Sequence, residues 1–136
     1  MQDIGTLLVL CVILYVMWWM RQRFGSVRKK QKKVTTDFRR KIESHLQRIQ
    51  NKPLDRQVIE LDKVLDKLLE YLGYQGSLGE MMKVYGPYFL DENAIWSAHK
   101  MRNKIVHELD FSPAPNVLRA HIKSFHMEID ALINRG

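Results

Sequence analysis

Cysteine is almost absent from this chain, which has 136 residues and only one cysteine, Cys11. A single thiol cannot form a disulfide within the chain, which is consistent with a reducing compartment. Cys11 falls in an apolar run, where we expect it to fill space rather than react. The missing thiols also argue against a zinc site, because the histidines of the second half have no cysteine beside them and no standard ligand spacing. Those histidines are His99, His107, His121 and His126. We therefore expect no metal and no other cofactor.

Several common signatures are missing as well. No stretch alternates apolar and polar residues as a half-buried strand does, and there is neither an internal repeat nor a low-complexity tract. The glycines of "GYQGSLGE" precede no Gly-Lys-Ser/Thr and follow no strand, which excludes a phosphate-binding loop. Ser77 and Ser97 have no nucleophile-elbow context. The sequence predicts an all-α fold.

A long uncharged run lies near the start, over residues 4–20. At about 1.5 Å per residue it reaches roughly 26 Å, slightly short of a hydrocarbon core of about 30 Å. Trp18 and Trp19 stand where an aromatic belt meets the interface, and Arg21 follows. A cleaved signal peptide would need positive charge before the run, whereas Asp3 precedes it. The pattern predicts a single transmembrane helix, with residues 1–20 as the anchor.

Positive charge is concentrated directly after this run. Residues 1–41 contain ten Lys or Arg and two acidic residues, a formal charge of +8, whereas residues 42–136 contain twelve and thirteen, a charge of −1. This bias predicts a single-pass membrane protein with its N-terminus outside and its bundle on the cytoplasmic side. We expect residues 21–41 to contact anionic lipid headgroups rather than RNA. Residues 21–33 would form a basic linker, and residues 34–136 the folded domain.

The domain shows helical spacing throughout. Apolar residues recur every three or four positions from Val34 to Ile49, before Pro53, and again from Val58 to Leu72, with Asp55 as the expected N-cap of the second helix. A glycine-rich connection follows. Within it the capping-box spacing of Ser77 and Glu80 predicts a short helix over residues 78–85.

Two further helices are expected, over residues 92–108 and from about residue 116 onward, separated by "FSPAP". The last carries its apolar stripe at positions 117, 118, 121, 122, 125, 129 and 132. Four long helices in about 100 residues can enclose one small bundle core that would gain from dimerisation.

The third long helix has an unusual polar stripe. At about 100° per residue, one narrow face carries the four residues Trp96, His99, Asn103 and His107. The core-facing side is predicted to comprise Ile95, Ala98, Ile105, Val106 and Leu109. Arg102 projects among these apolar residues, so its guanidinium must find a carboxylate or carbonyl groups, or extend to the edge of the core.

The stretch "RNKIVHE", residues 102–108, resembles the R-x(4–6)-H signature of the HEPN superfamily. Arg102 and His107 match its two fixed positions, and Asn103 occupies the polar position that commonly follows the arginine. The order of helices, with "SLGEMMK" before "AIWSAHKMRNKIVHE" and a final helix after it, is similar to small bacterial HEPN-like bundles over about residues 55–134.

The resemblance implies a four-helix bundle that often pairs with a second copy. We expect pairing through the stripe of Trp96, His99, Asn103 and His107, because leaving its aromatic surface in water would lose apolar burial. Trp96 and His99 would then line the dimer interface or contact substrate. Catalytic members cleave RNA without a metal. Here His107 would move a proton at the ribose 2′-hydroxyl or the leaving oxygen. Arg102 would bind the scissile phosphate, and Asn103 would hold substrate or the partner motif by hydrogen bonds.

Two function classes remain open. The first is a membrane-anchored, metal-independent endoribonuclease, assembled as a homodimer and acting on RNA, with an unidentified protein as its regulator. The alternative is a non-catalytic membrane-tethered module for dimerisation or protein interaction. The near-neutral charge of residues 42–136 gives little attraction for a polyanion. An ideal helix also separates Arg102 from His107 by about 140° around its axis.

Overall fold

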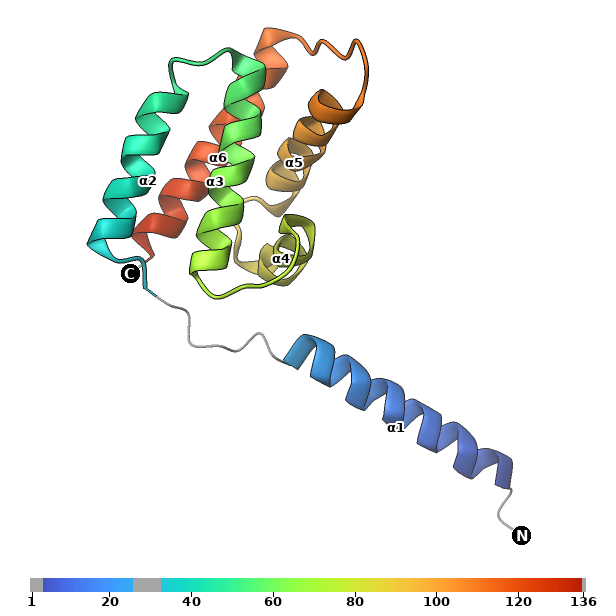
Figure 1. The fold of residues 1–136 in the computed structure, drawn as a ribbon. Helices are drawn as coiled ribbons and strands as arrows, with labels where there is room; N and C mark the ends of the chain where they lie inside the picture. The colour runs from blue at the N-terminus through green and yellow to red at the C-terminus, as the bar shows by residue number, and fades with distance from the viewer. Residues whose placement is uncertain (1–3, 26–32, 136) are drawn as a thin grey trace. The chain divides into compact units, whose positions relative to one another are not determined.

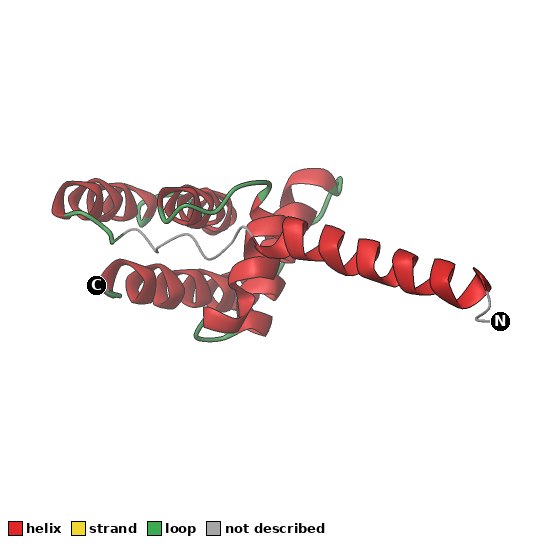
Figure 2. Ribbon diagram, turned by 90° about the horizontal axis from the view of Figure 1, so that it is seen from below, coloured by secondary structure: helices red, strands yellow, loops and turns green. Residues whose placement is uncertain are grey.

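The computed structural model describes residues 4–25 and 33–135, and the side chains of residues 8–19 and 33–135. The chain divides into two units, Met1–Gln31 and Lys32–Gly136. In the described residues every regular element is a helix, as the colouring of Figure 2 shows. The prediction of an all-α fold is confirmed for this part of the chain.

The first unit contains one helix, α1, over Ile4–Gly25. No helix within residues 4–25 and 33–135 combines the length and the apolar composition that crossing a membrane requires. The uncharged run of α1 covers only residues 4–20, about 26 Å, and arginines follow it at positions 21 and 23. The predictions of a transmembrane helix and of a single-pass topology, with the N-terminus outside and the bundle on the cytoplasmic side, are therefore wrong. The linker and lipid contact expected around residues 21–41 fall partly on residues 26–32, which lie outside the described residues.

The second unit begins with α2 over Thr36–Ile49 and α3 over Leu54–Tyr71. The Thr35 side chain caps α2 by accepting from the backbone N–H of Phe38. Pro53 is the N-cap residue of α3, so Asp55 lies in its first turn instead of capping it as predicted. The carboxylate remains favourable there because it meets the positive end of the helix dipole.

The predicted short helix is confirmed as α4, Leu78–Tyr85. Ser77 and Glu80 form the expected capping box, in which each side chain accepts from the other residue's backbone N–H. A 3₁₀ turn, η1, follows over Gly86–Tyr88. Helix α5 then covers Glu92–His107, capped by Asp91, and α6 covers Pro115–Asn134 with proline in its first turn.

Helix α3 is the centre of the bundle. It packs against α2, α4, α5 and α6, and the long helices run in alternating directions with α4 near the end where α3 finishes (Figure 1). Their buried apolar side chains form one core, whose largest fully buried members include Tyr85, Phe125, Leu61 and Leu65. At about 25 cal/mol per Å² of apolar surface, this burial is the main force that joins the helices.

Two residues predicted to face the core do not. Val106 is 45% exposed and Leu109 is 96% exposed. Leu109 is exposed because α5 ends before it: Glu108 has an extended backbone and Asp110 a positive φ of 57°, so the helical face does not continue past His107. Ile95 and Ala98, about two to three turns before Val106, are buried as expected.

Candidate functional site

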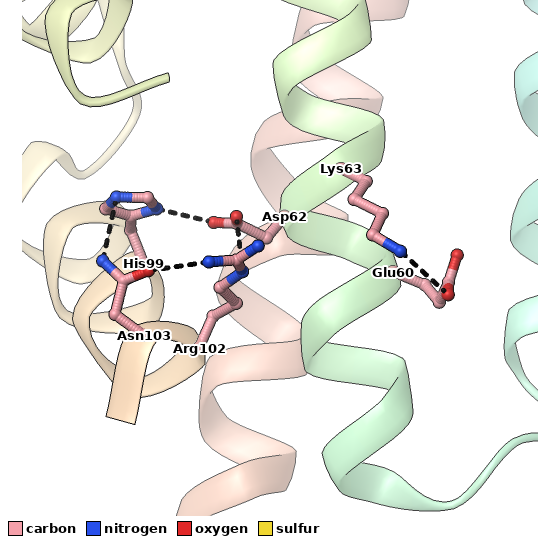
Figure 3. A network of polar contacts seen from close by, with 6 residues as sticks. All are labelled: Glu60, Asp62, Lys63, His99, Arg102 and Asn103. Atoms are coloured by element: carbon pink, nitrogen blue, oxygen red, sulfur yellow. Dashed lines mark hydrogen bonds and ion pairs between the residues drawn. The ribbon is translucent and has the colours of Figure 1, made fainter. Parts of the chain in front are cut away.

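Helices α3 and α5 are joined by a polar contact in the middle of the bundle (Figure 3). Asp62 of α3 has a side chain that is only 6% exposed. One carboxylate oxygen, Oδ1, lies 2.8 Å from His99 Nδ1, and the other, Oδ2, lies 3.3 Å from Arg102 Nε. The arginine contact is an ion pair without hydrogen-bond alignment. Thus the partner of Arg102 is a carboxylate, one of the partners that the sequence analysis considered for an arginine on an apolar face.

Asn103 closes these contacts into a ring. Its side-chain oxygen Oδ1 accepts a 2.9 Å hydrogen bond from Arg102 Nη1, and its amide nitrogen Nδ2 lies 3.3 Å from His99 Nε2 (Figure 3). We call Asp62, His99, Arg102 and Asn103 the polar ring. Because each member contacts two others, the ring fixes the side chains of α5 against α3.

The residues expected to form a dimer interface are partly covered within the chain. The indole of Trp96 packs against the core and lies edge-on to the His99 ring, with centroids 6.2 Å apart. A Cβ added at Gly79 of α4 would lie 4.0 Å from Trp96 Cη2, so α4 approaches the indole closely. The role of this stripe in dimerisation stays a prediction, but Trp96 already has a structural role in the bundle.

An open groove of about 460 Å³ borders the polar ring. Helix α3 supplies most of its charged lining and the start of α4 supplies a neutral wall. The lining comprises Asp62, Lys63, Asp66, Glu70, Gly76, Ser77, Leu78, Gly79, His99 and Arg102. Partial burial raises the pKa of the Asp66 carboxyl, and the nearby negative charges of Glu70 and Asp62 raise it further, against the smaller effect of Lys67 and Arg102. The groove is thus weakly suited to an anion.

His107 stands apart from the polar ring. It is the last residue of α5, it is exposed, and it has no side-chain hydrogen bond or ion pair with another described residue. Arg102 instead points to α3, where it forms an ion pair with Asp62. The structure therefore brings together four of the five predicted site residues, Arg102, Asn103 and His99 in the polar ring and Trp96 against His99, and leaves His107 separate. Within the described residues no group of three His, Cys, Asp or Glu side chains could hold a metal ion.

A second buried polar cluster lies between α6 and the segment that follows α4. Glu128 is 1% exposed, and its Oε2 accepts a 2.7 Å hydrogen bond from the backbone N–H of Leu90, whereas Oε1 has no partner. Burial raises the pKa of Glu128, opposed by the Leu90 hydrogen bond and the charge of Arg135. Arg135 itself donates to Tyr85 Oη at 2.7 Å and to the Tyr88 carbonyl.

Asp62 is the site residue that the sequence analysis missed. The signal was present, because Asp62 lies four residues after Val58 and three before Leu65, both of which are fully buried. A carboxylate in that register must face the core and needs a cationic partner or hydrogen-bond donors. Arg102 is a cation on an apolar face of another helix, so it was a suitable partner for Asp62.

Comparison with known proteins gives no match. No protein-family model, no curated protein and no solved structure matches the chain significantly.

Proposed function

We propose that residues 34–136 form a HEPN-like helical module that acts through protein association, including pairing with a second copy, and that does not cleave RNA. The observation that carries this proposal is the use of Arg102 inside the chain. Its Nε is paired with the buried carboxylate of Asp62, and its Nη1 donates to Asn103. A guanidinium engaged in this way supports the packing of α5 on α3, because removing either partner would leave a buried charge uncompensated.

The geometry of the Arg-His pair also favours this function over catalysis. Metal-free RNA cleavage needs a cation at the scissile phosphate and an imidazole within hydrogen-bond reach of the reacting hydroxyl at the same time. Arg102 faces α3, whereas His107 is exposed at the end of the same continuous helix. Five residues on a straight helix correspond to about 140° of rotation, so one chain does not bring both groups to one phosphate.

The charges around Arg102 also favour protein association over RNA cleavage. The groove beside it contains three carboxylates, from Asp62, Asp66 and Glu70, and only two groups that are always cationic, Lys63 and Arg102. RNA binding relies on several Lys or Arg side chains that replace counterions along the phosphate backbone. The net formal charge of this groove is negative, so it repels the phosphate backbone of RNA. A protein partner does not need a positively charged surface.

The surface we assign to association is apolar and lies where α5 passes into α6. Val106, Leu109 and Val117 are 45%, 96% and 37% exposed. Leu109 lies in the loop over residues 108–114, Val106 lies before this loop and Val117 lies after it. Grouped exposed apolar side chains mark association surfaces more often than scattered ones. We call these three residues the apolar corner and propose that a second copy covers it, next to His107.

A second candidate function is the endoribonuclease, and one observation favours it. The His107 ring is exposed and has no side-chain partner among the described residues, so it is free to act on a proton. In a pair of chains, the apolar corner would bring the two His107 side chains close to one interface, and groups from both copies would share the chemistry. This candidate requires metal-independent cleavage that depends on His107.

Sedimentation of the full chain tests the association surface. We expect wild-type chains to pair and Leu109→Glu to prevent pairing, because a charge replaces an exposed apolar group. Met127→Glu is the matched control, since Met127 is 53% exposed on α6 about three turns away from its start. It should pair as the wild type does. Monomeric wild-type protein, or equal pairing of both variants, would remove the apolar corner from the proposal.

A further inference from the structure

The polar ring determines the proton state of His99. An arginine Nη1 only donates, so the Asn103 atom that faces it must be the oxygen, which turns the amide nitrogen toward His99 Nε2. An amide nitrogen also only donates. His99 Nε2 must therefore present a lone pair, and the ring proton must sit on Nδ1, where it is donated to Asp62 Oδ1 over 2.8 Å.

We infer that the polar ring is a proton-operated latch, in which a proton added to His99 Nε2 expels the Asn103 amide and releases Arg102 Nη1 from it. The added proton comes from solvent and occupies the lone pair that accepted the amide. Two N–H groups would then face each other over 3.3 Å. Rotating the Asn103 amide to offer its oxygen to His99 would turn its NH₂ toward Arg102 Nη1, which is again donor against donor. Neither the present nor the flipped orientation of the Asn103 amide satisfies both neighbours once His99 is charged.

Released groups would change the surface of the groove. Arg102 and His99 both line it. In the neutral state the Nη1 of Arg102 is held by Asn103, whereas in the protonated state this donor and the Asn103 amide are free for a ligand or partner. Asp62 keeps its contacts with His99 and Arg102 in both states, so α3 and α5 stay joined while the exposed side of the ring opens. Histidine suits this role because it is the side chain that ordinarily changes charge between about pH 5 and 8.

The surroundings of His99 contain charges of both signs. From α3 the groove receives Asp62, Lys63, Asp66 and Glu70, and from α5 it receives Arg102. The α4 side contributes Gly76, Ser77, Leu78 and Gly79 to the lining, with no charge, and α6 contributes nothing to it. The donor conflict at Nε2 does not depend on this balance, because it follows from which atoms face one another.

Nuclear magnetic resonance of the full chain tests the latch. At neutral pH the ¹⁵N shifts of the His99 ring should identify the Nδ1–H form. As the pH falls, the side-chain amide signals of Asn103 should shift with the same midpoint as the His99 ring. His107, exposed on the same helix, is the internal control, and Asn103 should not follow its titration. An Nε2–H form of His99, or Asn103 signals that stay constant through the His99 titration, would overturn the inference.

A variant tests the donor conflict directly. In Asn103→Asp both side-chain oxygens accept, so Arg102 keeps its partner and a protonated His99 gains one. We expect the His99 ring to become protonated at higher pH in Asn103→Asp than in the wild type, because an added opposite charge within hydrogen-bond distance favours the charged imidazole. An unchanged or lower midpoint would contradict the latch. Because these signals need no partner, the latch and the proposed association can fail independently.

Discussion

Asp62 and His99 lie 37 residues apart in sequence, yet Asp62 Oδ1 and His99 Nδ1 are 2.8 Å apart in the fold. The same carboxylate is the counter-ion of Arg102, at 3.3 Å from its Nε. One buried acid on α3 thus orients two predicted site residues of α5, His99 and Arg102. The arginine of the HEPN-like motif is tied to the core of its own chain by this acid.

Removing the charge of Asp62 should therefore destabilise the bundle. We expect Asp62→Asn to lower the free energy of unfolding by about 3 kcal/mol, because Arg102 loses its counter-ion in a largely buried place. Asp62→Asn combined with Arg102→Met should cost less than the sum of the single changes. Denaturant titration of the four proteins measures both effects. Strict additivity would show that the ion pair contributes no coupling energy.

Asp66→Asn is the matched control on the same helix. Burial and the like charges of Glu70 and Asp62 already raise the pKa of Asp66. Removing its charge should leave stability at neutral pH unchanged or slightly increased. If Asp66→Asn lowered the free energy of unfolding as much as Asp62→Asn does, the effect would not be specific to the ion pair of Asp62.

The helices were largely predictable, because their signals are local. Apolar spacing, Pro53 and the Ser77–Glu80 capping box each act within a few residues, and α4 matches its predicted bounds. The end of α5 was less clear, since periodicity alone extended the core face to Leu109, whereas the chain leaves the helix after His107. The uncharged run of α1 was long enough to suggest a membrane span but too short to form one.

The site was only half predictable, because its partners come from different helices. The sequence indicated that Arg102 needs a carboxylate or carbonyl groups, or must extend to the edge of the core, and the spacing placed His99 and Asn103 on one stripe. It did not choose among the acids of α3, because that choice depends on how α5 packs across that helix. The separation of Arg102 from His107, in contrast, followed from helix geometry alone.

Glu128 should make stability depend on pH. Burial raises its pKa above the ordinary value of 4.5, so the folded chain keeps a proton that the unfolded chain has released. Its contribution to folding is therefore present at pH below that ordinary value and is lost as the pH rises through the folded pKa. Glu128→Gln should flatten this decline in denaturant titrations across acidic and neutral pH. Asp130→Asn, an exposed acid two residues later, should not alter the slope.

Replacing the two glycines of the turn before α4 with alanine should lower stability by different amounts. Gly73 and Gly76 both have positive φ, 102° and 113°. A Cβ at Gly73 meets nothing within 4 Å, so Gly73→Ala should cost only the left-handed strain of about 1–2 kcal/mol. At Gly76 the added carbon would lie 2.8 Å from Glu80 Oε2, which the capping box holds in place.

Gly76→Ala should therefore cost about 1 kcal/mol more than Gly73→Ala, the typical contribution of a helix cap. Thermal or denaturant unfolding of the two variants measures the difference. Equal losses would show that Glu80 moves aside without affecting α4.

The most direct measurement is an RNA cleavage assay with the full chain and its His107→Ala variant. Chelator removes metal-dependent contaminants, and single-stranded and structured RNAs are incubated between about pH 6 and 8.5, where imidazole changes protonation. His107 is exposed, so the variant should fold with a stability change within about 0.5 kcal/mol. The association module predicts no cleavage by either protein. Cleavage by the wild type that disappears in His107→Ala would contradict it and establish the ribonuclease instead.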